Sequence, residues 1–81
     1  MYYVYILTSL KTKDKFYVGI TENFDRRMRE HSSPRKEQYT YRHAPWKLES
    51  YVAFTNMTRA KSFEAYLKTG SGRVFSKKHL I

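Results

Sequence analysis

Two segments rich in aromatic and branched apolar residues, separated by a short polar stretch, constrain the fold most. Residues 2–7 and residues 16–20 both have the composition of β-strands. The stretch between them, at residues 11–15, consists of lysines, a threonine and an aspartate, which is typical of a turn region. The sequence therefore predicts a β-hairpin near its N-terminus.

The alternation of side chains along the two strands predicts which residues share a face. If the apolar residues meet on the core side, Tyr5 and Tyr17 share the opposite side, together with Gly19. Two phenols and a glycine are an unusual composition for a core-facing surface, so this face is a candidate location for functional residues. The predicted core side of the hairpin holds Val4, Ile6, Val18 and Ile20.

The middle of the chain predicts one helix, a basic loop and a third strand. Thr21 is the expected N-cap of a helix over residues 22–31, in which Phe24 and Met28 form the apolar stripe. The loop at 32–46 contains two prolines, which argue against a continuous helix. Residues 48–54 are the expected third strand. The aromatic residues of the loop either stack on bases or pack in the core, and they are Tyr39, Tyr41 and Trp46.

The last third of the chain predicts two more helices. Thr58 is the expected N-cap of a helix over residues 59–69 that ends at Gly70, and residues 72–81 form a short basic helix. The predicted fold class is α+β, with a three-stranded antiparallel sheet flanked by helices in the order β-β-α-β-α-α. The predicted buried stripe of the first of these helices is Ala60, Phe63 and Leu67.

The charge of the chain indicates a polyanionic partner. Sixteen lysines and arginines against seven acidic residues give a net charge of +9, and such self-repulsion destabilises a compact state. Nucleic acid is the commonest polyanion, although a basic surface that serves only solubility remains an alternative. No membrane partner is expected, because the basic residues are spread along the chain and no apolar run approaches the roughly 20 residues of a membrane span.

Cysteine usage and the N-terminus restrict the class further. The chain has no cysteine, so it forms no disulfide and no thiolate zinc site. The apolar stretch near the N-terminus lacks the flanking features of a signal peptide. A soluble cytoplasmic protein is therefore expected.

Two charged residues lie on or beside predicted apolar stripes. Glu64 falls inside the stripe of the helix at 59–69, and Arg27 borders the stripe of the helix at 22–31. A carboxylate on an apolar face is costly unless it is paired or binds a metal ion. One inward carboxylate, one inward arginine and paired phenols suit phosphodiester hydrolysis, in which the carboxylate holds Mg²⁺ and the arginine neutralises charge on the phosphate.

The order of several motifs resembles the GIY-YIG nuclease family. Tyr3-Val4-Tyr5 and Tyr17-Val18-Gly19 are similar to the paired tripeptides that name this family. Arg27 and His31 follow at the spacing of the family's first helix, and Glu64 matches the family's metal-binding glutamate. The tail resembles that of short stand-alone members, which are related to the nuclease domain of the bacterial excision-repair endonuclease. The resemblance implies one nuclease domain over residues 1–81 that cleaves DNA by a one-metal mechanism.

The resemblance also implies a role for each matched residue. Tyr17 or Tyr5 would be the general base or the phenol that orients the attacking water. Arg27 would stabilise the pentavalent phosphate, and His31 would hydrogen-bond a tyrosine and tune it. Glu64 would be the sole protein ligand of Mg²⁺ or Mn²⁺.

Two departures from the family pattern keep a rival hypothesis open. Tyr3 stands where the family has glycine. The asparagine that many members carry after the glutamate helix has no counterpart, and Ser76 or a neighbouring lysine is the available substitute. The rival is a non-catalytic nucleic-acid-binding module that retains the nuclease fold. An RNA-directed nuclease is a second alternative.

Further basic residues are expected to contact the phosphate backbone. Such contacts carry no sequence information, so a protein partner is a possible source of specificity, and the sequence does not determine the oligomeric state. The expected nucleic-acid-binding residues are Arg26, Arg35, Lys36, Arg42, Arg73, Lys77 and Lys78.

Overall fold

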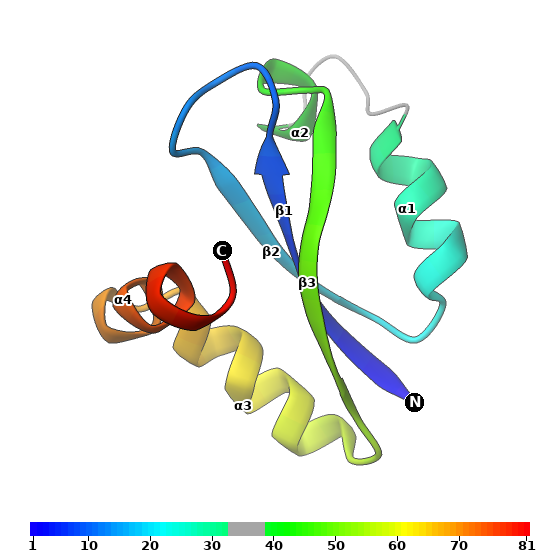
Figure 1. The fold of residues 1–81 in the computed structure, drawn as a ribbon. Coiled ribbons are helices and arrows are strands. Elements are labelled where there is room, and N and C mark those ends of the chain that lie inside the picture. The colour runs from blue at the N-terminus through cyan, green and yellow to red at the C-terminus, as the bar shows by residue number, and fades with distance from the viewer. Residues whose placement is uncertain (33–38) are drawn as a thin grey trace.

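A computed structural model gives the fold (Figure 1). It describes the backbone of residues 1–32 and 39–81, and the side chains of residues 1–30 and 41–81. The elements in chain order are β1 (Tyr2–Ser9), β2 (Phe16–Thr21), α1 (Phe24–Ser32), α2 (Tyr39–Arg42), β3 (Trp46–Phe54), α3 (Met57–Leu67) and α4 (Gly70–His79). The predicted α+β class and element order are confirmed, with the short helix α2 as an addition within the predicted loop. No helix in the described part of the chain is long and apolar enough to cross a bilayer.

The three strands form one antiparallel sheet in the order β2-β1-β3, so β1 is central. In the hairpin, Val4 pairs with Ile20 and Ile6 pairs with Val18, as the alternation predicted. The central strand is buried on both faces along its middle. Among the described residues, β2 and β3 are the edge strands of this sheet, and each pairs only with β1.

One face of the sheet carries the apolar core beneath α3 and α4 (Figure 1). Ala60 and Leu67 of α3 are buried there, and Phe63 is half-buried, which confirms the predicted stripe. Ser50 of β3 donates a hydrogen bond from its hydroxyl to the carbonyl of Leu80, 2.8 Å away, and so ties the end of α4 to the sheet. The fully or nearly fully buried members of this core are Val4, Ile6, Val18, Ala60 and Leu67.

The opposite face carries aromatic side chains beneath α1. Phe24 lies over the sheet, with its ring centroid 5.5 Å from that of Tyr3 and 5.0 Å from that of Tyr51. The ring of Tyr5 lies 6.5 Å from that of Phe24 in an edge-to-face arrangement. Helices therefore cover both faces of the sheet, and Tyr3, Tyr5 and Tyr51 belong to the face opposite the apolar core.

Two predicted N-caps are wrong by two residues. Asn23 caps α1, because its side-chain oxygen accepts a hydrogen bond from the backbone of Arg26 (2.9 Å). Thr21 instead holds the turn before the helix, since its hydroxyl oxygen accepts from the backbone N–H of Asn23. Asn56 rather than Thr58 caps α3 and accepts from the backbone of Arg59. In both cases two capping residues stand close together, and the polar pattern alone does not choose between them.

The junction between α3 and α4 also differs from the prediction. Lys68 is the C-cap of α3, and Thr69 is already the N-cap of α4, so Gly70 begins a helix instead of ending one. The hydroxyl of Thr69 donates to the carbonyl of Tyr66 (2.6 Å), and its oxygen accepts from the N–H of Gly72 (3.1 Å). One threonine therefore joins the two helices at a sharp corner.

Gly72 permits the close approach of these helices, and its replacement is a test of the packing. A Cβ at Gly72 would collide with the carbonyl oxygen of Tyr66, which is backbone and cannot swing away, whereas a Cβ at Gly70 meets nothing. We expect Gly72→Ala to lower the free energy of unfolding by about 1–3 kcal/mol, as overpacking does. The matched control, Gly70→Ala, should leave it unchanged or raise it by roughly 0.4–1 kcal/mol. Urea unfolding measures both, and equal stabilities would contradict this account.

Candidate active site

The buried phenol of Tyr5 is the centre of the candidate site. Tyr5 pairs with Gly19 across the hairpin, and only 1% of its surface is exposed. A Cβ at Gly19 would collide with the hydroxyl and the ring of Tyr5. The Tyr5 ring therefore lies across the backbone of β2 at Gly19 and directs its hydroxyl toward the outer edge of the sheet.

Tyr17 lies on the same face, as predicted, but closer to solvent. Its ring centroid is 6.3 Å from that of Tyr5, and the residue is half-buried. The ring of Trp46, at the start of β3, lies 6.4 Å from that of Tyr17. Trp46 therefore packs within the fold and Tyr41 is exposed, while the side chain of Tyr39 lies outside the described residues.

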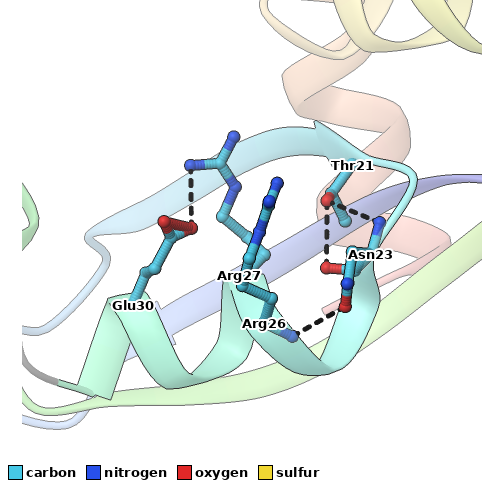
Figure 2. A network of polar contacts seen from close by, with 5 residues as sticks. All are labelled: Thr21, Asn23, Arg26, Arg27 and Glu30. Carbon is cyan, nitrogen blue, oxygen red and sulfur yellow. Dashed lines mark hydrogen bonds and ion pairs between the residues drawn. The ribbon is translucent and has the colours of Figure 1, made fainter.

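Arg27 extends from the first turns of α1, whose start is held by Thr21 and Asn23 (Figure 2). Its terminal nitrogen Nη1 lies 3.4 Å from the carboxylate of Glu30, and the side chain is 39% exposed. Its Nε is buried and has no hydrogen-bond partner among the residues that the structure describes. A buried guanidinium donor without a partner is suited to an anionic ligand.

Glu64 lies inside the stripe of α3, as predicted, and its side chain is only 21% exposed. Its Oε2 accepts a hydrogen bond from Nζ of Lys68, 3.3 Å away and one helical turn later. The carboxylate is thus half-buried and paired with a lysine that is itself largely exposed. The spacing of four residues is the sequence signal that identifies this partner.

The pKa of the Tyr5 phenol is affected by three other predicted residues. Burial raises the pKa of the Tyr5 phenol well above its ordinary value, and the neighbouring phenol of Tyr17 raises it further. The guanidinium of Arg27 lowers this pKa, whereas the carboxylates of Glu64 and Glu30 raise it. Side chains from β2, α1 and α3 therefore act on one phenol of β1. Tyr5 remains protonated at neutral pH.

Two open pockets lie along β2, and Glu64 lies between them. On α3, Lys61 contributes to one pocket and Lys68 to the other, and Glu64 stands between these lysines on the same side of the helix. The first pocket has a volume of about 380 Å³ and is lined by Asp14, Lys15, Phe16, Tyr17, Val18, Leu67, Lys68 and Arg73. The second has about 330 Å³ and is lined by Tyr2, Ile20, Thr21, Glu22, Arg26, Arg27, Met57 and Lys61.

The remaining predicted residues divide into three groups. The side chain of His31 and all of Arg35 and Lys36 lie outside the described residues. Ser76 is fully buried, so it cannot take the place of the family's asparagine beside a phosphate in solvent. Glu30 was missed, although its position one turn after Arg27 was a signal for the ion pair. The predicted nucleic-acid-binding residues that the structure describes are all exposed, and they are Arg26, Arg42, Arg73, Lys77 and Lys78.

The described residues suit a metal ion held by one carboxylate. They contain no group of three or more histidines, cysteines or carboxylates that would form a cage. Mg²⁺ is commonly bound through one or two carboxylates, with water and substrate phosphate completing its coordination. Glu64, half-buried between two basic pockets, fits that arrangement.

Comparisons with known proteins agree with the fold. The family model of the GIY-YIG catalytic domain matches residues 1–78. UPF0213 protein CPE1444 of Clostridium perfringens is 39% identical over 69 residues, which cover 84% of this chain and 71% of that protein. UPF0213 protein BH0048 of Halalkalibacterium halodurans is 36% identical over 73 residues, which cover 89% of this chain and 74% of that protein. The solution NMR structure of BH0048 matches with a TM-score of 0.55 and 33% identity, over 95% of this chain and 80% of that one.

The packing of Tyr5 against Gly19 predicts a measurable coupling. We expect Gly19→Ala to lower the free energy of unfolding by about 1–3 kcal/mol, because the new methyl group displaces the Tyr5 ring. In a Tyr5→Ala background the same change should cost less, by a coupling energy of roughly 0.5–3 kcal/mol. A double-mutant cycle followed by urea unfolding gives this coupling. Strictly additive effects would mean that the ring does not occupy this space.

Proposed function

Because this chain belongs to the GIY-YIG family, whose catalytic domains are nucleases, we propose that it hydrolyses phosphodiester bonds of DNA with one divalent metal ion. The observation that carries the proposal is that the ring of Tyr17 lies 6.3 Å from that of Tyr5, and that the charges of Arg27 and Glu64, on two further elements, act on the pKa of the same phenol. The net charge of +9 supports a polyanionic substrate.

We assign Tyr17, rather than Tyr5, to the attacking water. Tyr5 is buried, and its raised pKa keeps it protonated, so it is a poor base. Tyr17 is half-buried and lines an open pocket together with Lys68 and Arg73, where substrate and water have access. Tyr5 would serve as a hydroxyl donor that positions the groups around it.

Arg27 would stabilise the phosphate as negative charge builds on its oxygens. Its Nε is a buried donor without a partner among the described residues, and its guanidinium borders the pocket that contains Arg26 and Lys61. Such a preorganised donor is most effective in a site where water is partly excluded. The ion pair with Glu30 would hold the side chain in position before substrate binds.

Glu64 would hold the metal ion, Mg²⁺ or Mn²⁺. When bound, the cation would supply Lewis-acid polarisation of the phosphoryl oxygen. Lys68, whose ammonium group pairs with this carboxylate, would hold it in position and would add a positive charge beside the substrate phosphate.

The ion pair between Glu64 and Lys68 is also the observation that favours the alternative function. It compensates the half-buried carboxylate without any metal ion. In a nucleic-acid-binding module without catalysis, this ion pair alone would stabilise the carboxylate of Glu64. The following experiments distinguish the two functions.

Substitution of Glu64 and Arg27 tests the catalytic assignment. We expect Glu64→Gln and Arg27→Ala each to slow metal-dependent nicking of supercoiled plasmid by about 10²–10³-fold, the usual cost of losing one preorganised charge or donor. Affinity should change much less, because the surface lysines and arginines remain. The matched control is Glu49→Gln, a carboxylate paired with Lys47 away from Tyr5. A folded Glu64→Gln protein that nicks at the wild-type rate would leave the binding module as the better description.

The two tyrosines are expected to differ. Tyr17→Phe should slow nicking by roughly 10²–10⁴-fold, the range for loss of a group that transfers or orients a proton. Tyr5→Phe keeps the ring over Gly19 and should retain more activity than Tyr17→Phe. Single-turnover nicking at saturating protein measures the chemical step for both. A greater loss in Tyr5→Phe would reverse the assignment of the two phenols.

A further inference from the structure

Hydrogen bonds connect two segments from distant parts of the chain at one end of the sheet. The loop between β1 and β2 lies beside the segment that follows α2 and leads into β3 (Figure 1). The hydroxyl of Ser9 donates to the carbonyl of His43 (2.6 Å), and the N–H of Leu10 donates to the carbonyl of Pro45 (2.8 Å). The Ser9 oxygen also accepts from the N–H of Thr12 (2.8 Å). Several hydrogen bonds therefore hold the two segments in a fixed arrangement at this end of the sheet.

His43 is oriented by this arrangement. Its Nδ1 lies 3.0 Å from the hydroxyl oxygen of Thr12, and its ring centroid lies 6.4 Å from that of Trp46. The ring is thus fixed between the loop and the first residue of β3. The ring of Trp46 also lies 6.4 Å from that of Tyr17. Trp46 therefore connects His43 with the proposed catalytic phenol.

Three basic residues lower the pKa of His43 through their charges. Lys11 and Lys15 come from the loop between β1 and β2, and Arg42 comes from α2. Partial burial lowers the pKa of His43 below its ordinary value, and the charges of these three residues lower it further, in the order Lys15, Arg42, Lys11. The strand packed against the ring contributes Trp46, which does not titrate. We call Lys11, Lys15, Arg42 and His43 the hairpin-end cluster.

The hairpin-end cluster continues the basic surface of the candidate active site. Lys15 also lines the pocket that contains Tyr17, Lys68 and Arg73. Lys15 precedes Tyr17 by two residues, which corresponds to roughly 7 Å along an extended chain. A nucleic-acid strand whose phosphate lies at Tyr17 would therefore pass the hairpin-end cluster as it leaves the site.

We infer that the hairpin-end cluster is a second phosphate-binding surface, which holds the nucleic-acid backbone beyond the scissile phosphate and takes up a proton at His43 on binding. The inference rests on the proposed function for the identity of the ligand. In the unbound protein, burial and then the charges of the three cations disfavour the protonated form of His43, whereas a bound phosphate favours that form.

The sign of the pH effect follows from this change. The phosphate raises the pKa of His43, so the bound protein carries the proton at pH values where the free protein does not. Affinity therefore increases as pH falls through the pKa of the bound form, and it levels off below the lowered pKa of the free form. Each unit by which binding raises this pKa strengthens binding by about tenfold.

The test measures binding of a fluorescein-labelled duplex of DNA by anisotropy, between pH 5.5 and 8, at constant ionic strength and with a chelator present. Wild-type affinity should rise as pH falls. His43→Asn, which keeps a polar group near Thr12, should lose that part of the rise. His79→Asn is the matched control, because His79 lies exposed on α4, where its ring contacts that of Phe75 at a tilted angle. The inference is overturned if His43→Asn retains the wild-type pH dependence, or if wild type does not bind the duplex.

A second measurement tests the cations of the cluster. Lys11→Ala and Arg42→Ala should each reduce the slope of log K against log salt by about 0.9, the value for one lost phosphate contact. Arg59→Ala, at the other end of the sheet on α3, should not change it. Unchanged slopes in both cluster variants would also overturn the inference. Cleavage plays no part in this assay, so a wild type that binds in this way without nicking plasmid would contradict only the proposed nuclease function.

Discussion

The close contact between Tyr5 and Gly19 is the constraint on which the candidate site depends. A tyrosine of the central strand can reach the outer edge of the sheet only if its ring crosses the neighbouring strand, and a side chain at Gly19 would block this path. The contact buries the ring and places its hydroxyl over Gly19 of the edge strand β2. The absence of a side chain at Gly19 therefore allows a residue of the central strand to take part in a site at the edge of the sheet.

Residues from both faces of the sheet contribute to the candidate site along the edge strand β2. One face provides stability through the apolar core beneath α3, and the other carries the tyrosines beneath α1. Glu64 belongs to a core-facing helix, and Arg27 belongs to the helix on the opposite face, yet both influence the same phenol. The site is thus assembled around an edge instead of within a cavity, which leaves it accessible to a long polymer such as nucleic acid.

Much of this arrangement follows from local sequence patterns. Alternation predicted the shared face of Tyr5 and Tyr17, and helical spacing predicted the inward position of Glu64. The difference in burial between the two tyrosines was not predictable, because it arises from the place of each strand in the sheet and not from the strand's own sequence. The sequence also did not predict that Gly72 permits the close approach of α3 and α4, because this role depends on the distance between the two helices. Caps were misassigned where two suitable polar residues stood near each other.

The central position of β1 has a consequence for how the chain acquires its structure. The pairing of β1 with β2 is local in sequence, whereas its pairing with β3 joins Ser9 to Trp46 and Tyr2 to Phe54. During synthesis on a ribosome, the hairpin emerges early, but the second edge of its central strand stays unpaired until β3 has been made. Long-range pairing of this kind raises the contact order and slows folding relative to a helical bundle of similar size. The nascent hairpin therefore presents an open, apolar strand edge for part of its lifetime, and the arrival of β3 closes it.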